Sequence, residues 1–256
     1  MELTWQSYVV VCPLIFLAGL VDAVAGGGGL ISLPAYYAAG LPPYLASGTN
    51  KLSACMGATA ATARYLISGR VALLTGVLAA AGALPGSWLG AETQRLIPEQ
   101  TVRLMMLILI PMVAVLMLRR RGELKEKRRV PEKAAAPVSF AIGLVIGFYD
   151  GLVGPGTGTF LILLFVCLLG IDPVSASGTA RVVNLASNVA ALVSYWAGGY
   201  VLWQLAIPAG LCAVAGGLTG AGLTLKKGSA FIQKMLLVVL ALLLIKMAAD
   251  TLSAWI

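Results

Sequence analysis

Four consecutive glycines interrupt a long apolar segment near the start of this chain. The segment runs Gly19-Leu-Val-Asp22-Ala-Val-Ala-Gly26-Gly27-Gly28-Gly29, with apolar residues on both sides. Each glycine costs about 1 kcal/mol of helix propensity relative to alanine, so a continuous helix is not expected here. At membrane depth, non-helical backbone survives only where protein buries it or where it lines a cavity. A break of this kind, preceded by an acidic residue, is typical of a transporter's binding site.

The composition indicates a helical membrane protein with several spans. Hydrophobic residues make up 59% of the 256 residues, charged residues make up 11%, and the mean hydropathy is +0.93. A soluble domain has about 25% charged residues. Apolar stretches of about twenty residues, the length that crosses a bilayer, alternate with short polar pieces. The alternative, a large soluble protein with a buried core, is disfavoured by this composition.

The charged and reactive residues narrow the class of function. The net charge is +8, and eight of the 18 basic residues lie between Arg119 and Lys133. The positive-inside rule explains this cluster as a cytoplasmic loop, so it does not indicate nucleic-acid binding. The chain has no histidine, the usual metal ligand and catalytic base, and its four cysteines form no CxxC pair. We therefore expect no metal, no cofactor and no enzymatic activity.

The chain contains an internal duplication. Gly40-Leu-Pro-Pro-Tyr-Leu-Ala-Ser-Gly-Thr-Asn-Lys51 matches Gly170-Ile-Asp-Pro-Val-Ser-Ala-Ser-Gly-Thr-Ala-Arg181 at an offset of 130, with six of twelve positions identical. The same offset relates Gly69, Gly86 and Gly90 to Gly199, Gly216 and Gly220, and an offset of 128 relates Gly19 and Asp22 to Gly147 and Asp150. We predict two homologous transmembrane repeats, 1–118 and 137–256, joined by a basic cytoplasmic loop at 119–136.

The apolar pieces predict a similar series of helices in both repeats. The first series is 7–25, 30–39, 44–67, 71–92 and 101–118; the second is 137–153, about 158–170, 174–197, 201–224 and 231–255. In each series the short second helix follows a glycine break.

The distribution of basic residues predicts how the repeats sit in the membrane. If the two helices around each break form a re-entrant hairpin, Lys226, Lys227 and Lys234 fall inside with the loop at 119–136. If each helix pair crossed only once, those lysines would fall outside, against the positive-inside rule. The predicted fold is an all-α integral membrane protein with two inverted-topology repeats, each a glycine-broken re-entrant helical hairpin plus three transmembrane helices. Both termini are then outside.

Facing helix N-termini at the two breaks would make an anion site. A helix N-terminus presents free N–H groups and about half a positive charge, and glycine lets an oxyanion approach the backbone. The candidate substrate contacts at the breaks are Gly26, Gly27, Gly28, Gly29, Gly154, Gly156, Thr157 and Gly158. The alternative role of these glycines is to permit a tight turn.

Two cations and several polar residues extend the candidate site. Lys51 and Arg181 lie about seven residues inside their helices, roughly 10 Å deep. At this depth a cation usually faces the protein interior or a water-filled path, although its side chain can also snorkel to the headgroups. Polar residues near the same depth, able to bind a solute or helix backbone, are Ser47, Thr49, Asn50, Ser177, Thr179, Asn184 and Asn188.

Asp22 and Asp150 each stand four residues before their break. An intramembrane carboxylate at this place could carry a coupling proton, or it could cap backbone N–H groups of its hairpin. The residues alone leave both roles open.

The doubled motif resembles one family of transporters. Asp22-x3-Gly-Gly-Gly-Gly-Leu-Ile-Ser-Leu-Pro34, then Ala-Ser-Gly-Thr-Asn50-Lys51, and the second copy Ala-Ser-Gly-Thr-Ala-Arg181, are similar to the TauE/SafE sulfite exporter family, also called the toluene sulfonate uptake permease family. The resemblance covers essentially the whole chain. It implies a membrane carrier, and an exporter, of sulfite, sulfonates or sulfoacetate. The second break departs from the plain glycine run by containing Pro155 and Thr157.

We therefore expect a secondary transporter of a small sulfur-containing oxyanion in the cytoplasmic (inner) membrane, working by alternating access. Its expected partners are the anion, the lipid bilayer and coupling protons. A carrier of small carboxylates is the alternative, because the same cationic cavity would hold them. A non-transporting assembly subunit is a further alternative, although it would not need cations at matching depths in both repeats.

Overall fold

The computed structural model describes residues 5–98, 101, 130–232 and 234–235, and the regular structure in these residues is helical. The helices are α1 (Trp5–Ala25), α2 (Gly29–Ala38), α3 (Pro43–Ile67), α4 (Leu73–Leu96), the 3-10 helix η1 (Glu132–Ala134), α6 (Ala135–Leu152), α7 (Thr157–Leu169), α8 (Pro173–Ala197) and α9 (Trp203–Lys227). They lie within about four residues of the predicted bounds. The helices predicted at 101–118 and 231–255 fall almost wholly outside the described residues, as does most of the loop at 119–136.

Local sequence explains where several helices begin and end. Pro43 and Pro173 occupy the first turns of α3 and α8, where the missing proline N–H has no helical partner to lose. Asp172 caps α8 by accepting a hydrogen bond from a backbone N–H of its first turn at 3.0 Å. α7 lies between Gly156 and Gly170, whose φ angles of 85° and 67° favour glycine.

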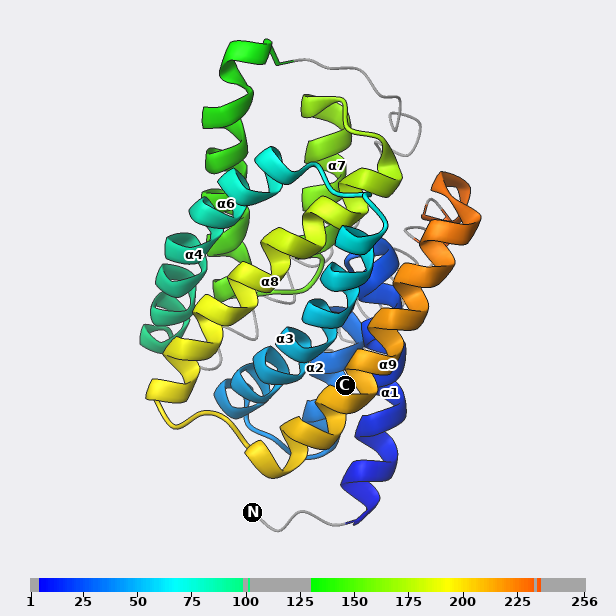
Figure 1. Cartoon of the computed structure of the whole chain (residues 1–256). Helices are drawn as coiled ribbons and strands as arrows, with labels where there is room; N and C mark the ends of the chain where they lie inside the picture. Colours follow the sequence, from blue (N-terminus) through cyan, green and yellow to red (C-terminus); the bar gives the residue numbers. More distant parts are fainter. Residues whose placement is uncertain (1–4, 99–100, 102–129, 233, 236–256) are drawn as a thin grey trace, which may run out of the picture.

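The helices of the two halves are interleaved. Figure 1 shows α3 and α8 crossing the middle of the molecule, with α4 and α6 on one flank and α1 and α9 on the other. The most extensive helix contacts are α4 with α6 and α1 with α9, followed by α3 with α9 and α4 with α8. Each of these contacts joins the first half of the chain to the second half.

Glycines allow the flanking helices to approach closely. An added Cβ on these α4 and α9 glycines would overlap a backbone carbonyl of the facing helix: Gly82, Gly86 and Gly90 face Phe140, Leu144 and Phe148 of α6, while Gly216 and Gly220 face Phe16 and Leu20 of α1. The α9–α1 contacts are related to the α4–α6 contacts by the offsets of 130 and 128. The duplication therefore recurs in the packing.

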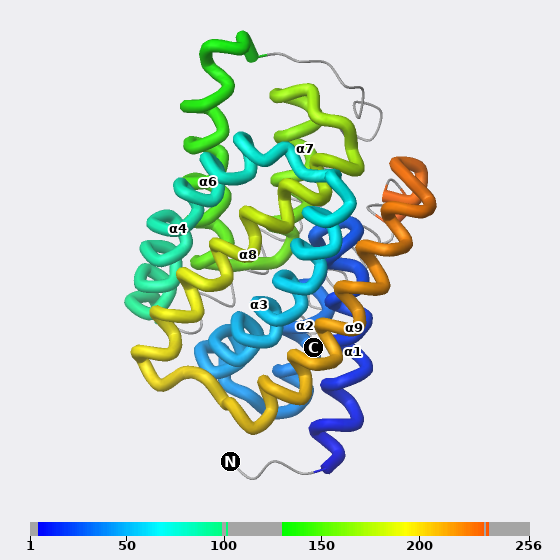
Figure 2. The backbone as a smooth tube through the Cα atoms, in the orientation of Figure 1, coloured from blue at the N-terminus to red at the C-terminus, as the bar shows by residue number. Residues whose placement is uncertain are grey.

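Both glycine breaks reverse the direction of the chain (Figure 2). Leu30 and Leu33 of α2 cluster with the end of α1, while Tyr36 and Leu41 cluster with its earlier turns. In the second half, the Val130 N–H just before α6 donates to a carbonyl near the end of α7 at 3.2 Å. α1 with α2, and α6 with α7, are thus antiparallel helix pairs.

Four helical segments of the described chain are long and apolar enough to span a membrane: Trp5–Ala25, Leu73–Leu96, Glu132–Leu152 and Trp203–Lys227. α3 and α8 are as long, with 25 residues each, but they are more polar because they lie between the other helices. α1, at 21 residues and thus about 31 Å, is long enough to cross a bilayer alone. Helix length therefore does not decide whether the α1–α2 pair is re-entrant.

Candidate functional site

The two glycine breaks are in contact with each other. Gly26 ends α1 with a φ of 78°, and its Cα lies against the backbone of Gly158 so closely that a Cβ on either residue would overlap the other. The hydroxyl of Thr159 donates a hydrogen bond to the carbonyl of Ala25 at 2.6 Å. The end of α1 therefore lies against the first turn of α7.

Asp22 forms an ion pair beside the first break. Its Oδ2 accepts a hydrogen bond from Nη1 of Arg181 on α8. Its Oδ1 accepts a hydrogen bond at 3.2 Å from the N–H of Gly28, the residue that precedes α2. Asp22 therefore binds a cation and caps its hairpin at the same time.

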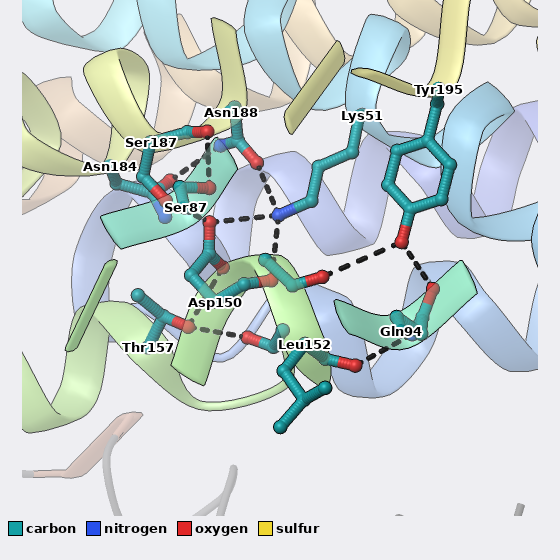
Figure 3. A network of polar contacts seen from close by, with 12 residues as sticks. Lys51, Ser87, Gln94, Asp150, Leu152, Thr157, Asn184, Ser187, Asn188 and Tyr195 are labelled. Carbon is teal, nitrogen blue, oxygen red and sulfur yellow. Dashed lines mark hydrogen bonds and ion pairs between the residues drawn. The ribbon is translucent and has the colours of Figure 1, made fainter. Parts of the chain in front are cut away.

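Lys51 and Asp150 form the second buried ion pair (Figure 3). The ammonium of Lys51 donates to Oδ2 of Asp150 at 2.8 Å, to the Asp150 carbonyl at 3.1 Å and to Oδ1 of Asn188 at 3.1 Å. These three bonds use all three donors of the lysine. Asp150 also accepts hydrogen bonds from the hydroxyls of Ser187 and, at 2.8 Å, Thr157. This pair is fully satisfied within the protein.

Each ion pair joins the two halves of the chain. Asp22 from the first half meets Arg181 from the second, and Lys51 from the first half meets Asp150 from the second. The side chains of Lys51, Asp150 and Arg181 are 7%, 4% and 0% exposed, while that of Asp22 is 24% exposed. Neither cation reaches the protein surface, which excludes the snorkelling alternative for this conformation.

Two asparagines of α8 connect the ion pairs. Oδ1 of Asn184 lies 3.4 Å from Nη1 of Arg181 and accepts a hydrogen bond from Nδ2 of Asn188 at 3.1 Å. Asn188 in turn accepts from Lys51. The hydrogen bonds therefore form a continuous chain from one cation to the other.

A cavity lies between these groups. The centre of a water-sized sphere can occupy about 70 Å³ of it, whereas a single water needs about 10–15 Å³. The cavity therefore has room for several waters or for a small ion. The predicted residues that line it are Asp22, Gly26, Gly28, Gly29, Ser47, Asn50, Lys51, Asp150, Gly154, Thr157 and Asn184, together with Asn188.

The remaining predicted residues do not line the cavity: Gly27, Thr49, Gly156, Gly158, Ser177, Thr179 and Arg181. Arg181 lies behind Asp22, and Gly158 lies against its guanidinium. Thr49 and Thr179 accept hydrogen bonds from the N–H groups of Leu202 and Ala72 at 3.0 and 2.9 Å. These two threonines occupy equivalent positions and anchor equivalent turns, while Ser177 donates to α1 backbone carbonyls. Contact of these hydroxyls with a solute stays a prediction.

Gly28 has a right-handed helical conformation with a φ of −56°, so a positive φ is not the reason for a glycine here. A Cβ at Gly28 would instead lie 2.6 Å from the Cβ of Asp22 and 2.7 Å from the carbonyl oxygen of Ala18. The missing side chain therefore makes room for Asp22.

Sequence reasoning did not find four polar residues that line the cavity, Ser32, Ser53, Gln94 and Tyr195. The hydroxyl of Tyr195 donates to Oε1 of Gln94, whose Nε2 donates to the carbonyl of Leu152 at 2.6 Å. Tyr195 matches Tyr65 at the offset of 130, and this match was the available signal. Gln94 lies beyond the predicted end of its helix at residue 92, so its inward position had no signal.

Comparisons with known proteins agree with the family that the sequence motif indicates. Residues 11–247 match the family model described as sulfite exporter TauE/SafE. The chain belongs to this family. It is 35% identical over 239 residues to a probable membrane transporter protein, ORF9, of Sinorhizobium sp, covering 92% of this chain and 90% of that protein.

Two further relatives have similar coverage. The probable membrane transporter protein YfcA of Escherichia coli K12 is 33% identical over 258 residues, covering 97% of this chain and 95% of that protein. A probable membrane transporter protein of Haemophilus influenzae is 32% identical over 237 residues, covering 92% of both. No solved structure matches the chain significantly. As a member of the TauE/SafE family, this protein is a membrane transporter.

Proposed function

We propose that this protein is a secondary transporter that moves small sulfur-containing oxyanions, such as sulfite or an organosulfonate, across the cytoplasmic membrane by alternating access. The observation that carries this proposal is a cavity beside the glycine breaks that is lined by Lys51 and by Asp22, the ion-pair partner of the buried Arg181 behind it. Intramembrane charges are costly and therefore mark solute pathways.

The chemistry of the cavity wall suits an oxyanion. Arg181, which lies behind Asp22, offers a planar fork of donors that matches tetrahedral or trigonal oxyanions, and the start of α2 offers a backbone N–H. Asn50 and Ser47 add hydrogen-bonding groups on α3, next to the positive charge of Lys51. The family description names sulfite, which favours sulfur oxyanions and the export direction.

Alternating access is supported by the exchanged contacts between the halves. The repeats at 1–118 and 137–256 contribute equivalent helices to both flanks, and each ion pair joins one repeat to the other. A small rotation of one repeat against the other would thus change both pairs together. In this proposal the repeats are inverted, the two antiparallel pairs are re-entrant hairpins and both termini are outside.

The alternatives explain less of the site. Small carboxylates would fit the same donors, so a carboxylate carrier remains the second candidate. An assembly subunit would leave the two buried cations and the cavity without a purpose. An enzyme would need reactive groups, and among the described residues no three His, Cys, Asp or Glu side chains gather as they would around a metal.

The test is a competition measurement in proteoliposomes. Purified protein is reconstituted, and uptake of labelled sulfite is measured against excess methanesulfonate, acetate or chloride. We expect saturable uptake that methanesulfonate inhibits more strongly than acetate. Stronger inhibition by acetate would favour the carboxylate carrier, and uptake no faster than in empty liposomes would contradict anion transport by this protein.

A further inference from the structure

We propose that Asp22 is the internal competitor of the transported anion: its carboxylate occupies the anion's binding groups, and a proton on Asp22 releases them. This inference rests on the proposed function and adds to it the coupling of one proton to each monovalent anion that binds. It also assigns different tasks to the two ion pairs.

The contacts of Asp22 are those of a bound oxyanion. One carboxylate oxygen accepts from the N–H of Gly28 at 3.2 Å, at the start of α2, and the other accepts from Nη1 of Arg181. A helix N-terminus together with a guanidinium is a general arrangement for binding oxyanions. In this structure, a residue of the chain itself fills the arrangement.

Arg181 still has unused donors. Its side chain is 0% exposed, yet Nε and Nη2 have no hydrogen-bond partner among the described residues. Nε carries one N–H and Nη2 carries two, so three of the five donors of a buried guanidinium are unsatisfied. Leaving buried charged donors without partners is costly. This deficit indicates that the guanidinium has a further ligand at another stage of transport.

The ion pair of Lys51 and Asp150 differs from that of Asp22 and Arg181 in its hydrogen bonds and in the exposure of its carboxylate. All three lysine donors are used, and Asp150 accepts from two hydroxyls as well. Its carboxylate is 4% exposed, against 24% for Asp22. In this conformation, Asp22 is therefore the carboxylate with the greater access to water and protons, whereas Asp150 is almost fully buried.

The charge of the cavity gives the reason for coupling. Two carboxylates and two cations sum to zero, so a monovalent anion entering alone would leave one uncompensated negative charge. Uncompensated buried charge is strongly unfavourable. A proton that moves from water to the Asp22 carboxylate makes that group neutral, and the anion then replaces it beside Arg181. The sum stays at zero.

The groups around Asp22 leave few other sites for this proton. α8 presents Arg181, and α3 presents Lys51 and Tyr65, whose hydroxyl donates to the carbonyl of Ala23 beside Asp22. α6 presents Asp150. α2 and α7 carry no charged residue, and the charged residues of α9, Lys226 and Lys227, lie in its last turn.

Binding of methanesulfonate to the detergent-purified full chain tests the proposal. This sulfonate keeps one negative charge across the usable pH range, so any pH dependence belongs to the protein. We expect its Kd to fall about tenfold for each unit of decreasing pH where Asp22 is ionised, the slope of one linked proton. In Asp22→Asn the slope should vanish, with the Kd at alkaline pH close to the parental value at acidic pH. Glu92→Gln, which neutralises the carboxylate of a half-buried pair with Arg95, should keep the parental slope.

The outcomes distinguish failure of the role proposed for Asp22 from failure of the proposed anion transport. Binding with a pH-independent Kd, or an unchanged slope in Asp22→Asn, overturns the role of Asp22 while anion transport stands. Absence of binding by methanesulfonate, sulfite and acetate alike overturns anion transport and this inference with it.

A second measurement needs no variant. Titration of the parental protein with methanesulfonate in buffers of different ionisation enthalpy gives the number of protons taken up on binding. We expect about one proton per bound anion in the range where the Kd depends on pH. Binding without proton uptake overturns the proposal even if Asp22→Asn fails to fold.

Discussion

At the scale of single residues, each buried cation of the cavity is held by a carboxylate from the other half of the chain. A substitution at either cation therefore also affects an acid that is distant in sequence. Removing one partner of a buried pair leaves an uncompensated charge, whereas removing both charges costs much less. This asymmetry separates structural effects from effects on transport.

Lys51→Ala should lower the free energy of unfolding by roughly 3–5 kcal/mol, because Asp150 keeps its charge without a partner. The double variant Lys51→Ala with Asp150→Asn should regain part of this loss, since no buried charge remains. Unfolding in detergent measures both values. Lys226→Ala, at an exposed lysine, should change stability by no more than about 0.5 kcal/mol. A single variant as stable as the parent would show that the pair is not formed.

Gly28→Ala should move Asp22 rather than obstruct the substrate directly. The new Cβ would lie 2.6 Å from the Cβ of Asp22, so the carboxylate must shift away from Arg181. We expect lower thermal stability together with a changed pH dependence of methanesulfonate binding. Gly76→Ala is the control, because its Cβ would find its nearest neighbour, in Thr179, at 3.5 Å. Unchanged stability and binding in Gly28→Ala would contradict the close packing of Gly28 on Asp22.

At the scale of helices, close packing between the halves depends on glycine. Two glycines of α4, Gly86 and Gly76, should differ in how substitution by alanine changes the stability of the protein. At Gly86 an added Cβ would overlap the carbonyl oxygen of Leu144 on α6, while at Gly76 it would make only ordinary contacts. The contact at Gly86 therefore limits how far apart α4 and α6 can lie, because only a close approach leaves no room for a Cβ.

Gly86→Ala should destabilise the protein by roughly 1–3 kcal/mol through overpacking. Gly76→Ala should be neutral or stabilising by up to about 1 kcal/mol, because alanine is the better helix former. Thermal unfolding of the two purified variants gives the comparison. Equal stability of both would show that α4 and α6 are further apart than in this structure.

Hydropathy and glycine pattern predicted the helices well, because both signals are local. The bounds of α2, α3 and α8 lie within about one residue of the expected ranges. The partners of the cations had no such local signal. The sequence places Asp22 and Lys51 in one repeat, and only the interleaving of helices brings each acid to the cation of the other repeat. Of the two roles left open for Asp22, capping and proton coupling, the structure shows capping and adds an ion pair with Arg181. Proton coupling by Asp22 stays a proposal.

At the scale of the whole molecule, the account requires a definite orientation in the membrane. The α2–α3 and α8–α9 turns lie at one end of the helix bundle, where the Tyr200 carbonyl packs on Gly48. The α3–α4 turn lies at the opposite end, where the Arg70 carbonyl packs on Gly178. The positive-inside rule places the end with Lys226 and Lys227 in the cytoplasm.

Cysteine labelling from each face tests this orientation. In a background without the native cysteines, Gln204→Cys at the start of α9 should react only with reagent added outside. Lys227→Cys at the end of the same helix should react only from inside. Both positions are exposed in the protein, so access from the membrane face decides the outcome. Labelling of Lys227→Cys from outside would contradict the hairpin topology.

The most direct test of the central claim, that a buried cation at the cavity binds the transported anion, is the uptake of labelled sulfite by proteoliposomes containing Arg181→Ala. Equal amounts of monodisperse parental protein, Arg181→Ala and the exposed control Arg70→Ala are compared. The account predicts saturable uptake by the parent and by Arg70→Ala, and uptake near that of empty liposomes by Arg181→Ala. Sulfite uptake by Arg181→Ala at the parental rate would contradict it.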